Sequence, residues 1–246
     1  VEFWSFLRRP GAQTKQGDDL FEGSCPNCGA SLRLNQVAEC EFCNAKVGNG
    51  QYDWVLAEIT QESEWKPGLH AEIPGFATML GADPTFSIQH LEDRASVMFW
   101  RRIAALLSGK ADPLRSMASE ECREALEKEL TPKPSGGRRV PTEVAVDSVD
   151  TLGVLCGGPK DQALLKVEWK GGWQSVMQDG RRGLRAGAEG WASFFVLSRN
   201  HGVTGDVDAV LSSAHCPRCG SPTAANATNA CEYCGTVLNQ GDRDWV

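Results

Sequence analysis

The chain has few of the sequence motifs that identify an enzyme class. Histidine occurs four times in 246 residues, and there is no HExxH helix, glycine-rich phosphate loop or nucleophile elbow. No segment approaches the ~20 apolar residues that a membrane-spanning helix needs. Basic residues are outnumbered by acidic ones, which gives a net charge of −7. These absences argue against the enzyme classes that such motifs define and predict no membrane span within the chain.

Cysteine, in contrast, is abundant and regularly spaced. Two Cys-x2-Cys pairs lie near the start and two near the end, and eleven residues separate the pairs in each copy. Residue numbers in the two copies differ by 191. At that offset Cys-Pro-x-Cys-Gly, Cys-Glu-aromatic-Cys and Gly-x2-Asp-Trp-Val all recur. We predict two metal sites with four cysteine ligands each, formed by Cys25, Cys28, Cys40, Cys43, Cys216, Cys219, Cys231 and Cys234.

The spacing suits a tetrahedral ion. Pro26 and Pro217 favour a tight turn inside a pair, and Gly29 and Gly220 leave room for backbone amides to approach the sulfurs. The arrangement resembles the zinc-ribbon family over about thirty residues at each end. The resemblance implies two structural Zn²⁺ ions, one per four-cysteine site, because four cysteine ligands leave no position for a catalytic water.

Other interpretations of the cysteines stay open. The eight could form disulfides, although adjacent Cys-x2-Cys pairs favour metal. Iron is the other candidate ion, because Cys-Pro-x-Cys-Gly also resembles rubredoxin sequences; zinc is favoured since nothing in the sequence indicates a flavin or a second cluster. Cys122 and Cys156 have no such partner, and we expect both to be buried structural residues.

Both predicted ribbons are slightly acidic. Residues 25–55 contain two basic and three acidic side chains, and residues 216–246 contain the same numbers. Phosphate binding needs clustered lysine and arginine, so nucleic acid is not an expected partner. A zinc-ribbon nucleic-acid-associated factor would require a basic stripe assembled in the folded protein from Arg101, Arg102, Arg138, Arg139, Arg181, Arg182 and Arg185.

Hydrophobic periodicity divides the chain into five parts. We predict an N-terminal stub and linker at 1–23, zinc ribbon 1 at 24–57, an extended connector at 58–82, an α+β domain at 83–205 and zinc ribbon 2 at 206–246. Turns are expected at 65–68 and 74–75 of the connector.

Inside the central domain, apolar residues recur every three or four positions from Ile88 to Leu106, which predicts a helix capped by Ser87 and ended by Gly109. A second helix is expected over 119–130. Strands are predicted over 144–155, 163–169, 173–177 and 191–198. Helices followed by antiparallel strands indicate an α+β fold.

Several short motifs give the central domain a family resemblance. They are Asp83-Pro84-x-Phe86-Ser87 before the long helix, Asp112-Pro113-Leu114 after it, and Trp191, Phe194 or Phe195, Leu197 and Arg199 in the last strand. Residues 83–205 are similar to the C-terminal domain of the 44 kDa subunit of the mitochondrial inner-membrane translocase. The resemblance implies a cone-like fold with a curved sheet around a helix, membrane attachment, partner proteins, and an apolar groove for lipid.

Together these features predict a non-catalytic zinc-binding adaptor for partner proteins. Trp4 and Phe6, followed by Arg8 and Arg9, resemble the interfacial end of a membrane helix, or else an amphipathic tail packed on the domain. We expect the chain to lie at the cytoplasmic face of a membrane as part of a longer, anchored polypeptide. The alternative is a cone-fold enzyme or a small-molecule or lipid-binding domain.

We also have expectations for five further side chains. His90 and Asp93 share a helix face and would form a surface pair. His215, beside a zinc cysteine, is expected to be an ordinary exposed residue. Trp54 and Trp245 are expected to cover the small cores of their ribbons, which cannot bury enough apolar area alone. The two ribbons are also expected to pack on each other and clamp the central domain.

Overall fold

The computed structural model describes residues 2–13, 23–32, 39–61, 72–131, 137–177, 179–205, 213–223 and 228–246. The predicted turn at 65–68, His70 and most of the predicted linker lie outside these residues. The elements in chain order are β1 (Glu2–Leu7), β2 (Val55–Gln61), α1 (Phe76–Ala82), α2 (Ile88–Ser108), the short 3-10 helix η2 (Asp112–Leu114), α3 (Glu120–Leu130), β3 (Gly137–Leu155), β4 (Lys160–Met177), β5 (Arg182–Arg185) and β6 (Glu189–Asn200).

Helix α2 has the ends that the sequence predicts. The Ser87 hydroxyl accepts a hydrogen bond from the His90 amide at 3.3 Å, and Gly109 ends the helix in a left-handed conformation with φ of 75°. The predicted second helix is confirmed as α3, capped by Ser119. None of the described helices is both long and apolar enough to cross a membrane.

The main sheet is antiparallel and centred on β4. Strand β3 pairs with one edge of β4, while β6 and the short β5 pair with the other. Side chains along β4 alternate between buried and exposed, as expected when one face of a sheet is covered. The stretch 173–177, predicted as a separate strand, is the end of β4, and β5 was not predicted. The α+β class is confirmed.

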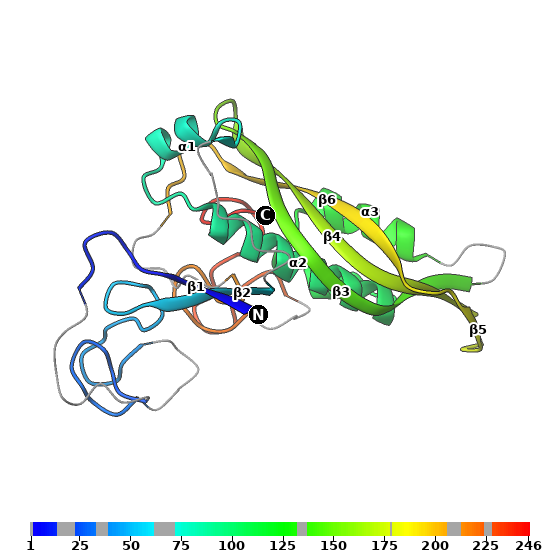
Figure 1. Cartoon of the computed structure of the whole chain (residues 1–246), viewed down its shortest axis with the longest axis horizontal. Coiled ribbons are helices and arrows are strands. Elements are labelled where there is room, and N and C mark those ends of the chain that lie inside the picture. Colours follow the sequence, from blue (N-terminus) through cyan, green and yellow to red (C-terminus); the bar gives the residue numbers. More distant parts are fainter. Residues whose placement is uncertain are drawn as a thin grey trace.

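The core lies between this sheet and α2, which runs along one face of the strands (Figure 1). Phe99 on α2 packs against Trp169 on β4 with ring centroids 5.6 Å apart. Trp173 and Trp191 extend the aromatic cluster from Trp169 along the sheet. Buried apolar side chains from both layers make this helix–sheet unit the largest core among the described residues.

The first residues form a strand. Strand β1 pairs antiparallel with β2, with Leu7 opposite Val55 and Trp4 opposite Ile59. The interpretation of this segment as the end of a membrane helix is therefore wrong. The segment predicted as an extended connector contains the end of β2 and helix α1.

The two repeated tryptophans have opposite environments. Trp245 is 2% exposed and packs in the core of the helix–sheet unit, 6.2 Å from the ring of Phe86. Trp54 is 53% exposed and lies under the guanidinium of Arg8 at 4.5 Å. The expectation that each tryptophan covers its own ribbon is wrong for Trp245, which packs in the helix–sheet core instead; for Trp54 it stays a prediction.

This difference predicts unequal effects of the same substitution. Trp245→Ala should lower the free energy of unfolding by about 3–5 kcal/mol, the usual cost of emptying a large aromatic site in a core. Trp54→Ala, the matched control, should cost no more than about 1 kcal/mol. Urea unfolding of both variants measures the two values. Equal costs would contradict the observed difference in burial.

Candidate metal centres

Each Cys-x2-Cys pair forms the same tight turn. The amide of the first cysteine donates to a carbonyl five residues later, as in Cys25 to Ala30 at 2.7 Å and Cys216 to Ser221 at 2.8 Å. The residue after the second cysteine is left-handed in all four turns, with φ of 75° at Gly29, 56° at Asn44, 71° at Gly220 and 68° at Gly235. Glycine, or asparagine, is required there because a Cβ is strained in this region.

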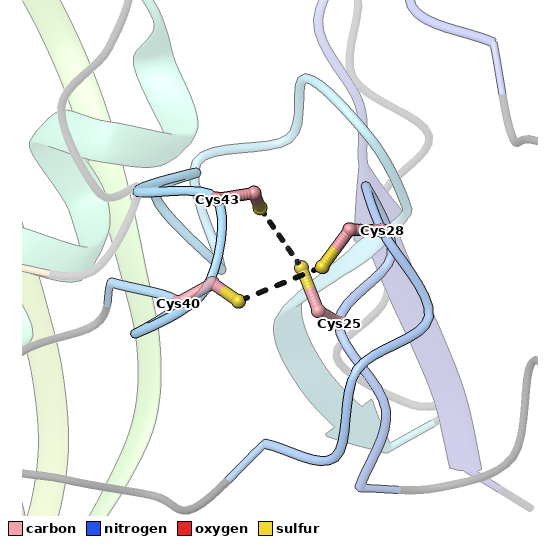
Figure 2. A group of neighbouring side chains, drawn as sticks. All are labelled: Cys25, Cys28, Cys40 and Cys43. Carbon is pink, nitrogen blue, oxygen red and sulfur yellow. Dashed lines mark hydrogen bonds between the residues drawn. The ribbon is translucent and has the colours of Figure 1, made fainter.

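The turns bring four sulfurs together at each site. In ribbon 1 the Sγ atoms of Cys25 and Cys43 are 3.7 Å apart, and those of Cys28 and Cys40 are 3.8 Å apart (Figure 2). In ribbon 2 the two corresponding distances are both 3.7 Å. A tetrahedron with Zn–S bonds of ~2.3 Å has edges of about 3.8 Å. The eight predicted ligands therefore form two groups that could each hold a metal ion.

Hydrogen-bond donors favour the thiolate at some of the sulfurs, whereas burial raises the pKa of Cys216 to about 12. The Ala30 amide lowers the pKa of Cys28, but burial and the neighbouring thiols outweigh it and raise that pKa to about 12. The backbone amide of Ala45, together with the side-chain amide of Asn27, lowers the pKa of Cys43 to about 6. In ribbon 2, burial raises the pKa of Cys231, but the Ser221 hydroxyl and backbone amides outweigh it and bring the pKa to about 6. Such donors around the ligands are usual for structural zinc sites.

Ribbon 2 is attached to α2 by polar side chains. The Arg101 guanidinium donates to the Thr223 carbonyl and to the Ser116 hydroxyl, each at 2.7 Å. Asp93 accepts from the amide of Ser213 at 2.7 Å. The ribbon is thus bound along one side of the helix. A hydrogen bond from Lys46 to the Arg218 carbonyl, at 3.4 Å, joins the two ribbons, and their packing on each other stays a prediction.

The end of ribbon 2 is held by a partly buried charge cluster. The Asp244 carboxylate contacts His90 at 2.9 Å and Arg94 at 2.8 Å, and Arg94 also donates to the carbonyl of Trp245. Burial raises the pKa of Asp244, but the charges of Arg94 and His90 outweigh it and lower that pKa. The predicted His90–Asp93 surface pair is wrong: the two side chains bind different parts of ribbon 2. Sequence reasoning missed Arg94 and Asp244.

A third group of possible ligands lies at the end of the sheet. One ligand atom each from Cys156, Asp161 and His201 lie within 4.8 Å of one another. His201 Nδ1 is 2.8 Å from the Asp161 carboxylate, which also accepts from the Gly157 amide at 3.1 Å and has Arg199 3.5 Å away. The neighbouring arginine disfavours a cation there, so the group serves to join the β3–β4 turn to the end of β6.

The other singled-out residues have ordinary environments. Cys122 is exposed and Cys156 is partly exposed, so the expectation that both are buried is wrong. His215 is only partly exposed, contrary to expectation; its Nδ1 is buried, and burial lowers the pKa of its ring.

Several of the paired arginines are engaged by neighbouring groups, while Arg138 and Arg182 both lie opposite Val176 at one end of the sheet. Arg101 is buried against ribbon 2, and Arg138 donates to carbonyls at the end of α2. Arg102 pairs with Glu129, and Arg185 pairs with Glu143. Neighbouring carboxylates and carbonyls therefore use much of the donor capacity that phosphate contacts would need.

Comparison with known proteins adds no relative: no family model matches the chain, and no curated protein matches it significantly.

The unequal attachment of the ribbons predicts unequal effects of metal loss. Pure protein should contain two zinc ions per chain, and Cys25→Ser and Cys216→Ser should each remove one. Only Cys216→Ser should also lower the stability of the helix–sheet unit, because ribbon 2 supplies Trp245 to its core. Elemental analysis and hydrogen exchange of β4 amides measure both effects. Three ions per chain, or equal destabilisation by the two variants, would contradict this account.

The charge cluster predicts a pH-dependent cost of Asp244→Asn. Removing one partner of a buried pair costs about 3–5 kcal/mol. Asp244 raises the pKa of His90 against the opposing effect of burial. The stabilisation from a protonated His90 is therefore complete below about pH 6.5 and is lost as pH rises through the folded-state pKa. Urea unfolding should show a larger cost at pH 6 than at pH 8.5. Asp53→Asn, the matched substitution in the first copy, should be close to neutral at both.

Proposed function

We propose that the chain is a non-catalytic, zinc-binding scaffold that docks partner proteins. The observation that carries the proposal is the solvent exposure of the aromatic residue inside each Cys-Glu-aromatic-Cys turn. Phe42 is 74% exposed and Tyr233 is 46% exposed, although both lie between metal-ligand cysteines. An aromatic ring held in solvent by a rigid turn is typical of an interface anchor.

Zinc explains why such anchors are rigid. In the part of each ribbon that the structure describes, the apolar cluster around the cysteines is small. A unit of that size does not fold on burial alone, whereas a zinc ion with four cysteine ligands contributes on the order of 10–16 kcal/mol. The exposed ring therefore loses little conformational freedom on binding, which favours affinity. Tetrahedral sulfur spacing suits zinc and iron alike, and the absence of a recognisable redox partner in the sequence supports zinc.

The outer face of the main sheet offers a second docking surface. Phe194 and Val196 on β6 and Leu164 on β4 are exposed, and Val196 lies directly opposite Leu164 in the sheet register. Apolar side chains that gather on one face, rather than being scattered singly, are typical of sites of protein contact. The scaffold would thus contact partners through both ribbons and this sheet face.

The inner face of the sheet supports a non-catalytic role. It presents Leu165, Val167 and Trp169 to α2, and these side chains are buried. The buried carboxylate of Asp83 is engaged by Arg199 at 2.7 Å and by the Thr85 amide at 3.0 Å. Burial, followed by the charge of Asp161, raises the pKa of the Cys156 thiol, which is the opposite of what a nucleophilic cysteine needs.

We place this scaffold at the cytoplasmic face of a membrane, within a longer anchored polypeptide. The support is the resemblance of residues 83–205 to the translocase-subunit domain, whose members are membrane-attached and bind proteins. Nucleic acid is not an expected partner, because both ribbons are acidic and the paired arginines contact neighbouring carboxylates, carbonyls and an aromatic ring.

Site-specific photo-crosslinking tests the docking role. A photoreactive phenylalanine analogue at position 42 or 233 should crosslink to the same partner proteins in native cells. Introducing Cys25→Ser should abolish the crosslink at position 42, because the turn loses its ion. The analogue at Leu184, which is exposed on β5 far from both ribbons, is the control position. Equal labelling at 42, 233 and 184 would contradict docking through the ribbons.

A further inference from the structure

The internal repeat begins before the cysteines, in β1. At the offset of 191, Phe3 corresponds to Phe194, Arg8 to Arg199 and Gly11 to Gly202. Both glycines are left-handed, with φ of 79° at Gly11 and 82° at Gly202. Gly11 lies four residues after the end of β1, and Gly202 lies two residues after the end of β6. Strand β1 is therefore the counterpart of the last part of β6, the final strand of the helix–sheet unit.

The two copies also share their contacts. Arg8 lies 4.5 Å from the Trp54 ring, and Arg199 lies 4.6 Å from the Trp245 ring. The Arg9 amide donates to the Gly50 carbonyl at 2.9 Å, as the Asn200 amide does to Gly241 at 2.7 Å. Leu7 pairs with Val55, and Ser198 pairs with Val246. In each copy, the segment after the ribbon returns to the strand before it in the same way.

The environments around these contacts differ. Leu197, in the main core, is 2% exposed and Phe195 packs against that core, so this side of β6 is covered. Their counterparts, Phe6 and Trp4, are 47% and 55% exposed. Leu56 and Ile59, which lie opposite them on β2, are exposed as well. Strand β1 thus carries the inward side chains of a helix–sheet unit without the helix.

The strand pairing of β1 and the contacts of Asp53 also differ from those of their counterparts in the second copy. Strand β6 pairs with β4 along its length, whereas within the described residues β1 pairs with β2 alone. Asp244 contacts Arg94 and His90 of α2, while its counterpart Asp53 is exposed. In both copies the aspartate accepts from the following tryptophan amide at 2.8 Å, so Asp53 already has the conformation that binds arginine in the second copy.

We propose that β1 is the final strand of a second helix–sheet unit with the architecture of residues 76–192. That unit pairs a β4-type strand with the second edge of β1, covers Trp4 and Phe6 with an α2-type helix, and binds Asp53 with an arginine at the position of Arg94. A second copy of this chain does not fit, because its own β6 and Asp244 occupy those positions. The inference does not depend on the adaptor role.

A duplication tests this. Residues 76–192 are placed directly before Glu2, so that Glu2 follows Ala192 as Ser193 does in the second copy. Hydrogen exchange of the β1 amides should become slower by about 100-fold or more, as the strand joins a cooperative core. Asp53→Asn, silent in the unextended chain, should now lower the unfolding midpoint as Asp244→Asn does.

The matched control adds residues 76–246, a unit with its own final strand and with the ribbon whose Trp245 completes its core. It should fold while β1 keeps its rapid exchange, which shows that a duplicated unit is tolerated in this position. If that control folds but the 76–192 fusion leaves β1 exchange and the effect of Asp53→Asn unchanged, the proposal is wrong. Dimerisation of the unextended chain through Trp4 and Phe6, detected by sedimentation and abolished by Trp4→Asp, would also overturn it.

Discussion

The arrangement of the chain depends on the ion pairs made by the partly buried carboxylate of Asp244. Its charge is balanced by Arg94 and His90 on α2, and the same arginine binds the carbonyl of Trp245. Because an unpaired charge is not tolerated in such a place, the segment must lie against this helix. Trp245 then fills the core and Val246 pairs with β6. Ribbon 2 is therefore part of the central fold rather than an appended module.

The first copy shows that local sequence does not decide this burial. Both Asp-Trp-Val segments have the same aspartate-to-amide hydrogen bond and the same arginine over the tryptophan ring. Only the second faces a helix with an arginine in reach. The motif therefore sets a conformation that is complete before docking, and its surroundings decide whether the tryptophan is buried. Preorganisation of this kind reduces the ordering cost of forming the interface.

Features determined by local rules could be predicted from the sequence, and features set by long-range contact could not. The limits of α2 follow from Ser87 and Gly109, and the metal ligands follow from cysteine spacing. Nothing near His90 indicates that its partner lies 154 residues away. The correspondence of β1 to the end of β6 could have been predicted, because Arg8 and Gly11 repeat at the same offset of 191 as the cysteines. The aromatic side chains of β1 alone do not indicate it.

Each copy of the repeat forms a loop that begins and ends beside the same strand. The chain leaves a strand at Arg8 or Arg199, forms a ribbon, and returns beside the same strand at Val55 or Val246. Closing a flexible loop of this length costs conformational entropy, which increases with the number of residues between the ends. A metal ion that joins two turns inside the loop shortens the part that remains free. The cation–π contact and the backbone pairing would then need to order only the last few residues, so an ion bound at each site would direct the following segment to the edge of the preceding strand.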